Sequence, residues 1–181
     1  MKTKIFNLKT LAWIFAITLT TVFFSCEKDD DPFKECRKHP DCEYFTCKIN
    51  GKRWEPQCDG GPLFGCTPWD VQYSKNVPGF FASVTNENEN QHVYLTVRGK
   101  KLQIGSNKLY IDEFVQTRFF DGSNQACSNY LIDTLQNYDL VISRIDSVNN
   151  YLSGKFYFTA INKCNEIKTI SDGEFNLPYT F

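Results

Sequence analysis

The stretch that decides the fold is Tyr151-Leu152-Ser153-Gly154-Lys155-Phe156-Tyr157-Phe158-Thr159-Ala160-Ile161. Every second position carries an apolar or small residue: Leu152, Gly154, Phe156, Phe158 and Ala160. The positions between them carry polar residues and a tyrosine: Ser153, Lys155, Tyr157 and Thr159. Because side chains of a β-strand point alternately to opposite faces, this period of two predicts a strand with one buried and one solvated face.

Further short strand signals flank this stretch. Residues 167–177 follow it, with a turn or bulge predicted at Asp172-Gly173. The other candidate strands are 80–85, 91–98, 102–104, 108–111, 115–120 and 138–145. The remaining segments are predicted as a loop (56–79), a solvated turn (86–90) and a stretch that could hold a short helix (128–137). Turn signals about every ten residues predict an all-β class: an antiparallel β-sandwich or barrel-like domain of about eight strands.

The domain is predicted to begin with a hairpin at Asn50-Gly51. This dipeptide is typical of a type I′ turn, because both central residues need a positive φ. Such a turn places Cys47 opposite Trp54, on the face that also carries Phe45 and Ile49. We expect that face to point into the core.

The first 25 residues have the pattern of a secretory signal peptide. Lys2, Lys4 and Lys9 precede an apolar run from Leu11 to Phe24. This run is shorter than the roughly 20 residues of a membrane-spanning helix, which is the alternative interpretation. Ser25 and Cys26 end the segment and resemble the bacterial lipobox, which implies cleavage before Cys26 and attachment of diacylglycerol and fatty acid such as palmitate to that residue.

The residues after Cys26 bear on the cellular location of the protein. The run Glu27-Lys28-Asp29-Asp30-Asp31 resembles the acidic export signal of Bacteroidetes surface lipoproteins. The resemblance implies a protein anchored by lipid in the outer membrane and exposed at the cell surface. A flexible tether is the plainer interpretation of the same charges. The predicted domain organisation is a signal peptide (1–25), a lipidated acidic tether with a cysteine-containing segment (26–44) and a β domain (45–181).

The charge balance of the chain bears on which kinds of partner it can bind. Three of the 20 basic residues and none of the 21 acidic ones lie in residues 1–25, so the remaining 156 residues carry 17 basic and 21 acidic groups, a formal charge of −4. A mildly acidic chain with no basic block argues against nucleic acid as a partner. The 16 phenylalanines and nine tyrosines favour strands.

Seven cysteines follow Cys26, and an exported chain is expected to pair them as disulfides. An odd number leaves at least one unpaired within the chain. Cys58 and Cys66 are the clearest pair, since the residues between them include Gly60 and Gly61. Cys127 and Cys164 are predicted to join two distant loops. A third disulfide is expected within the set Cys36, Cys42 and Cys47, whose pairing the spacing leaves open.

Two stretches carry a family resemblance. Residues 152–160 and 170–177, together with Asn50-Gly51-Lys52-Arg53-Trp54, resemble an uncharacterised family of Bacteroidetes lipoproteins. The resemblance implies a β-rich domain of unknown function and a surface location, and it assigns no catalytic residues. The cysteine-rich section 36–66 departs from the family pattern.

No catalytic or metal-binding constellation is evident. His39 and His92 are the only histidines, and no nucleophile motif accompanies them. A zinc site at His39 would need closely spaced cysteine pairs, which are absent. We therefore predict no catalytic residue, no metal and no cofactor. Asp133-Thr134-Leu135 and Asp146-Ser147-Val148 resemble the O-glycosylation triplet of the same bacteria.

Two function classes remain. The favoured one is a non-catalytic binding or adhesion module that recognises a glycan or a protein through exposed aromatics, with Trp69, Tyr73 and Tyr94 as candidate contacts. The alternative is a hydrolase of extracellular polymers that uses carboxylates such as Asp112 and Glu113.

Overall fold

The computed structural model describes residues 31–60, 65–74, 79–109, 116–123 and 125–180. The chain divides into two compact units, Met1–Lys34 and Glu35–Phe181. In the described part of the first unit, the Asp31 carboxylate accepts a hydrogen bond from the Phe33 N–H (3.1 Å), and the Asp31 carbonyl accepts one from the Lys34 N–H (3.1 Å). The fold described below is that of the second unit.

The second unit is built from strands joined by turns. A short 3₁₀ helix, Cys36–Lys38, precedes them. The strands are β1 (Tyr44–Ile49), β2 (Lys52–Trp54), β3 (Trp69–Tyr73), β4 (Gly79–Asn86), β5 (Gln91–Arg98), β6 (Gly105–Asn107), β7 (Arg118–Asp121), β8 (Asn129–Ile132), β9 (Asp139–Asp146), β10 (Tyr151–Asn162) and β11 (Ile167–Pro178). All pairs between these strands are antiparallel, so the predicted all-β class is confirmed.

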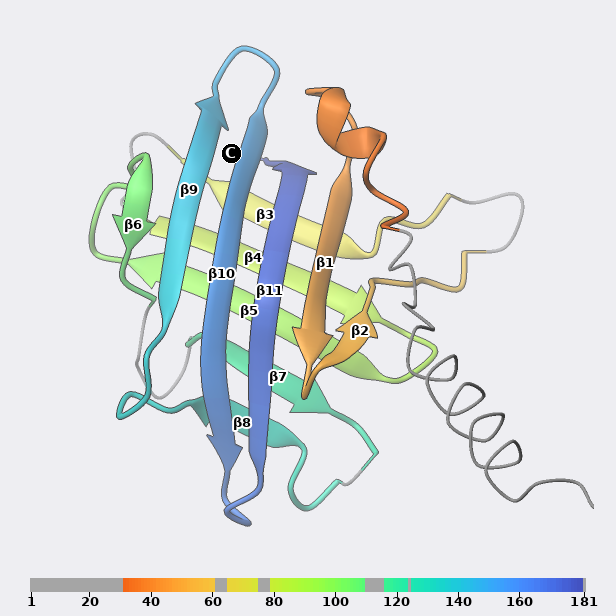
Figure 1. Cartoon of the computed structure of the whole chain (residues 1–181), viewed down its shortest axis with the longest axis vertical. Helices are drawn as coiled ribbons and strands as arrows, with labels where there is room; N and C mark the ends of the chain where they lie inside the picture. The colour runs from red at the N-terminus through yellow and green to blue at the C-terminus, as the bar shows by residue number, and fades with distance from the viewer. Residues whose placement is uncertain (1–30, 61–64, 75–78, 110–115, 124, 181) are drawn as a thin grey trace, which may run out of the picture. The chain divides into compact units, whose positions relative to one another are not determined.

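The strands form one curled sheet that folds over itself into two layers (Figure 1). One layer contains β9, β10, β11 and β1, and it lies across the layer of β3, β4, β5, β7 and β8. The long strand β10 connects them. Its residues Tyr151–Tyr157 pair with β9, whereas Ala160–Asn162 pair with β8. Because β10 belongs to both layers, the side chains on one of its faces point into the core along the whole strand.

The core fills the space between the layers. Leu152, Phe156 and Phe158 of β10 are buried there, as the alternation predicts. Aromatic contacts connect the layers: the ring centroids of Phe80 on β4 and Phe175 on β11 lie 6.2 Å apart. Burying one such side chain contributes roughly 1.5 to 3 kcal/mol, so this aromatic cluster is a principal source of stability.

The bulge predicted at Asp172-Gly173 is present. Phe156 pairs with Gly173 and Phe158 with Ile170, so β11 has one extra residue there. Asp172 has a φ of 51°, which aspartate tolerates better than most residues. A Cβ on Gly173 would lie 2.6 Å from the Phe156 ring, so only glycine allows this close approach.

The predicted type I′ hairpin is also confirmed. Asn50 and Gly51 have φ angles of 52° and 80°, and Cys47 pairs with Trp54. Phe45, Cys47 and Trp54 are buried in the core.

Four local predictions are wrong. The stretch 56–79, predicted as a loop, contains β3, and the possible helix at 128–137 contains β8. β8 is four residues long and is held between β7 and β10, so its sequence carries little periodic signal. Residues 102–104, predicted as a strand, do not form one; the strand in this region is β6, at Gly105–Asn107, which pairs with β9. Asn86, predicted in a solvated turn, is buried because its amide donates to the Glu55 carbonyl (2.9 Å).

The disulfides agree with the cysteine predictions. Cys58 pairs with Cys66, and Cys127 pairs with Cys164. Cys36 pairs with Cys42, which the sequence left open. Among the cysteines that the structure describes, Cys47 is unpaired, and burial in the core raises the pKa of its thiol. A buried neutral thiol behaves as a small apolar side chain.

Candidate functional site

A groove of about 600 Å³ lies on the outer face of the layer formed by β9, β10 and β11. We call it the outer groove. The side chains that matter for its chemistry are Asp139, Val141, Lys155, Tyr157, Thr159 and Glu174. Asp139 and Val141 come from β9, Glu174 comes from β11, and the others come from β10.

Strand register brings these residues together. Lys155 pairs with Val141 on one side and with Glu174 on the other. Tyr157 pairs with Asp139 in the next row. Directly paired residues project from the same face of a sheet, so the two rows form one surface. They point outward because Phe156 and Phe158, which alternate with them, point into the core.

Tyr157 is the central aromatic residue of the outer groove. Its side chain is 45% exposed, and Val141 in the neighbouring row is 38% exposed. Both line the groove together with the hydroxyl of Thr159. An exposed aromatic ring beside hydroxyl and charged groups can stack on an apolar face of a ligand while its neighbours form hydrogen bonds.

The charges of the outer groove are partly neutralised by one another. The Glu174 carboxylate lies 2.7 Å from the Arg37 guanidinium and 3.9 Å from the Lys155 ammonium. Asp139 accepts hydrogen bonds from the Ser106 hydroxyl and from the Leu140 N–H. Each carboxylate is therefore engaged by a different partner, on opposite sides of β10.

Asp139 and Glu174 do not match the spacing of a glycosidase pair. Glycosidases place two carboxyl groups about 5 to 9.5 Å apart across the scissile bond. Asp139 and Glu174 are separated by two strand spacings, about 10 Å, and by a further step along the strands.

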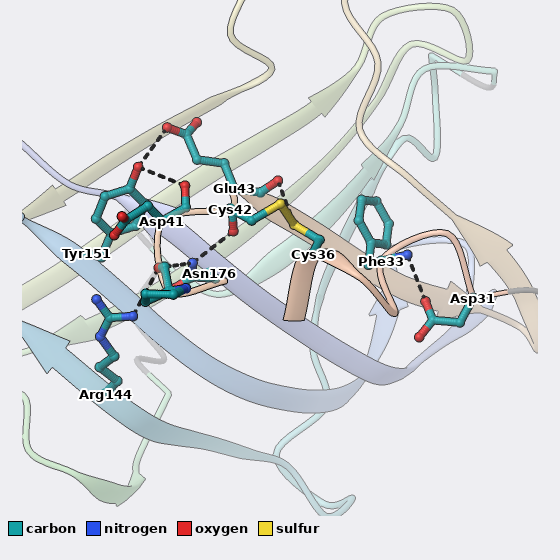
Figure 2. Close-up of a disulfide and its surroundings, with 10 residues drawn as sticks. Asp31, Phe33, Cys36, Asp41, Cys42, Glu43, Arg144, Tyr151 and Asn176 are labelled. Atoms are coloured by element: carbon teal, nitrogen blue, oxygen red, sulfur yellow. Dashed lines mark hydrogen bonds between the residues drawn. A yellow bond between two sulfur atoms is a disulfide. The ribbon is translucent and has the colours of Figure 1, made fainter. Parts of the chain in front are cut away.

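One end of the outer groove is bounded by the disulfide loop, defined here as residues 36–42 closed by Cys36 and Cys42. Figure 2 shows how it is held. The Asn176 amide donates to the carbonyls of both Pro40 and Cys42 (2.9 Å each), and the Arg144 guanidinium donates to Pro40 (3.0 Å). The loop is therefore fixed on β9 and β11 through its backbone carbonyls.

A second set of contacts fixes the segment that leaves the loop. The Tyr151 hydroxyl donates to the Asp41 carbonyl (3.3 Å) and to the Glu43 carboxylate (3.1 Å; Figure 2). Burial, reinforced by Glu43, raises the pKa of Tyr151. The phenol therefore remains a neutral hydrogen-bond donor at neutral pH.

Arg37 joins the disulfide loop to the outer groove. Its guanidinium pairs with Glu174 and lies 5.6 Å from the centre of the Tyr44 ring. Burial and the nearby Glu174 raise the pKa of Tyr44. This cation–π contact and the ion pair position Arg37 as a wall of the groove.

The structure does not bring the three predicted contact aromatics together. Trp69 and Tyr73 lie on β3 and pack against or within the core, whereas Tyr94 lies on the outer face of β5. The expectation that Tyr73 is exposed is wrong. It is 4% exposed because its ring packs edge-on against Tyr179, with centroids 5.1 Å apart.

Tyr94 belongs to a separate, half-buried aromatic cluster. The Arg118 guanidinium lies 4.4 Å from its ring centre, and the His92 ring stacks at 5.9 Å. His92 in turn contacts Phe120. Burial, followed by the charge of Arg118, lowers the pKa of His92. Neutral His92 is the form expected at physiological pH.

Several other sequence predictions lie outside the described residues: Cys26, Asp29, Asp30, Asp112 and Glu113. Within the described ranges, no group of three or more His, Cys, Asp or Glu side chains is placed to hold a metal ion. The same part of the chain contains no helix that is long and apolar enough to cross a membrane.

The two predicted glycosylation triplets adopt the same local structure. In each, the aspartate carboxylate accepts a hydrogen bond from the N–H of the third residue, Leu135 or Val148 (3.0 Å each). These third residues are 92% and 87% exposed, and the hydroxyl residue before each is exposed as well. Modification at Thr134 or Ser147 stays a prediction, which the intact mass of the protein from its native host tests.

Sequence reasoning placed Tyr157 on the solvated face but did not single it out as a site residue. Alternation alone predicts that it points outward. Alternation does not reveal which residues surround Tyr157 in the folded protein, because Val141, Glu174 and Arg37 lie far from it in the sequence.

Comparison of the chain with family models, with curated proteins and with solved structures gives no match in any of the three.

Proposed function

We propose that this protein is a lipid-anchored, non-catalytic glycan-binding module on the outer surface of the cell. The observation that carries the binding proposal is the outer groove, in which Tyr157 is exposed among Lys155, Asp139 and Thr159. The flat face of a sugar ring carries C–H groups that pack on an aromatic ring, and its hydroxyls pair with charged and hydroxyl side chains.

Binding in the outer groove predicts that Tyr157→Ala removes glycan recognition. The test is a glycan array probed with the chain that follows the signal peptide, made soluble by Cys26→Ser. Tyr94→Ala is the matched control, since Tyr94 is an outward tyrosine of the other layer. We expect signal from wild type and Tyr94→Ala, and a loss of about ten-fold or more for Tyr157→Ala. Equal loss for both variants, or no glycan bound by wild type, contradicts the proposal.

The anchoring proposal is supported by the sequence around Cys26 and by the acidic run after it. It predicts incorporation of an alkyne-tagged palmitate into wild type and none into Cys26→Ser. An intact first 25 residues in the wild-type protein, without label, would refute lipid attachment.

The surface location follows from the same resemblance. Protease added to intact cells should degrade the anchored protein while a periplasmic marker stays whole. Protection until the outer membrane is broken would place the protein inside.

A further inference from the structure

A second, smaller depression of about 220 Å³ lies at the end of β5 and beside β6. We call it the basic pocket. Four of the residues that line it are cationic: Arg98, Lys100, Lys101 and Lys108. None of its described lining residues is acidic. Val97 and Leu109, both buried, supply apolar parts of the lining.

The backbone that carries these cations is held in place. Gly99 and Gly105 have φ angles of 73° and 103°, which suit glycine and turn the chain at both ends of the connection. Just after Gly105, the buried Asn107 amide donates to the carbonyls of Gln103 (2.8 Å) and Gly105 (2.7 Å), and its oxygen accepts from the Gln103 N–H (3.2 Å). The lysines therefore project from an ordered frame.

The charge of the basic pocket is concentrated. Its four cations fall within residues 98–108 of a chain whose formal net charge is −1, so the fold gathers a local basic cluster that the sequence, with no continuous basic block, did not indicate. Lys100, Lys101 and Lys108 have no carboxylate within ion-pair distance among the described residues. Like charges gathered in a concave surface raise the local positive potential, and an anion that enters the basic pocket is stabilised by Lys100, Lys101 and Lys108.

The basic pocket adjoins the outer groove. Ser106 of β6 pairs with Val141 of β9, and the Ser106 hydroxyl donates to Asp139. Ser106 lines the pocket, whereas Val141 and Asp139 line the groove. Figure 1 shows β6 lying along β9. Tyr157 on β10 is thus two strand spacings, about 10 Å, from β6.

We infer that the glycan bound by this protein is an acidic polysaccharide, whose sulfate or carboxylate groups enter the basic pocket while a neighbouring sugar stacks on Tyr157. This inference rests on the proposed glycan-binding function. Lysine ammonium groups form charge-assisted hydrogen bonds with such anions. A flat anionic bilayer offers the same charge, but it cannot follow a surface that runs from a pocket into a groove.

The test uses two matched pairs of polymers: dextran sulfate with dextran, and polygalacturonate with its methyl ester. Binding is measured by biolayer interferometry with the Cys26→Ser chain at low and high NaCl. The variant is Lys100→Gln, Lys101→Gln and Lys108→Gln combined. The control is Lys34→Gln, Lys52→Gln and Lys163→Gln, three exposed lysines outside the pocket. Thermal unfolding verifies that both triple variants fold.

We expect wild type and control to bind an acidic polymer at least about ten-fold more tightly than its neutral partner, with the preference reduced by salt. The pocket variant should lose that preference. Equal binding of acidic and neutral polymers, or equal loss in both triple variants, would overturn the inference. Tyr157→Ala separates the two proposals: if it leaves the binding of every polymer unchanged while the pocket variant does not, the outer groove is the part that fails.

Discussion

At the scale of single residues, two glycines make room for buried phenylalanine rings between β10 and β11. Gly154 pairs with Phe175, and Gly173 pairs with Phe156. A Cβ on Gly154 would meet the Phe175 ring at 2.9 Å, and one on Gly173 would meet the Phe156 ring at 2.6 Å. Each phenylalanine thus covers the glycine on the neighbouring strand, which restores the packing that a glycine lacks.

Gly173→Ala is therefore expected to lower the free energy of unfolding by about 2 kcal/mol, because the added methyl group must displace a buried ring and the Phe156 carbonyl. Urea denaturation measures the change. Gly65→Ala is the control, since nothing lies within 4 Å of its Cβ position, and it should shift stability by less than about 0.5 kcal/mol. Similar losses at both positions would show that the Phe156 contact is not the cause.

At the scale of elements, a buried amide, that of Asn176, makes two of the hydrogen bonds that join the disulfide loop to the sheet. Asn176 lies on the outer side of β11, yet it is buried because the loop covers it. Its amide satisfies the carbonyls of Pro40 and Cys42, and its oxygen accepts from the Ser153 hydroxyl (2.5 Å). The wall of the outer groove therefore depends on this residue as well as on the disulfide.

Asn176→Ala should cost about 2 kcal/mol, because the hydroxyl of Ser153 and both loop carbonyls lose a partner. The loop should also become more open to hydrogen exchange at residues 36–42. Thermal unfolding and exchange mass spectrometry measure the two effects. Asn129→Ala, at an exposed position of β8, is the control. Unchanged exchange in the loop would mean that the disulfide and the contacts of Arg144 and Tyr151 hold it without Asn176.

At the scale of the whole compact unit, the two layers are connected by polar contacts as well as by the core. The Trp54 indole on β2 donates to the Gln91 side chain on β5 (2.8 Å). Lys168 of β11 pairs with the buried carboxylate of Asp121 on β7 (3.1 Å). Burial opposes ionisation of Asp121, but hydrogen bonds from Ser123 and Lys168 outweigh it and lower its pKa. The pKa of Asp146 at the β9–β10 turn is lowered too, chiefly by hydrogen bonds from Asn149 and Arg144.

These shifts predict loss of stability in acid. A carboxyl whose pKa is lower in the folded than in the unfolded state stabilises the fold fully above its ordinary pKa, which is 3.8 for aspartate, and less as the pH falls below that value. The urea midpoint should therefore fall between pH 5 and pH 2.5. Asp121→Asn should flatten that dependence, while the exposed Glu89→Gln should not. A midpoint that does not change across this range would refute the linkage.

The alternation in 151–161, the Asn50-Gly51 turn and the Asp172-Gly173 bulge determined the strand class, the hairpin and the bulge, because local φ preferences and a period of two act over a few residues. The positions of the cysteines indicated two of the disulfide pairs. Only the tertiary structure decided that β10 serves both layers, that β3 and β8 are strands, and that Tyr73 is buried. It alone placed Arg37, Tyr157 and Glu174 in one groove beside the lysines of the basic pocket. Those placements depend on contacts between residues far apart in the chain, and a local pattern carries no information about which distant strand becomes a neighbour.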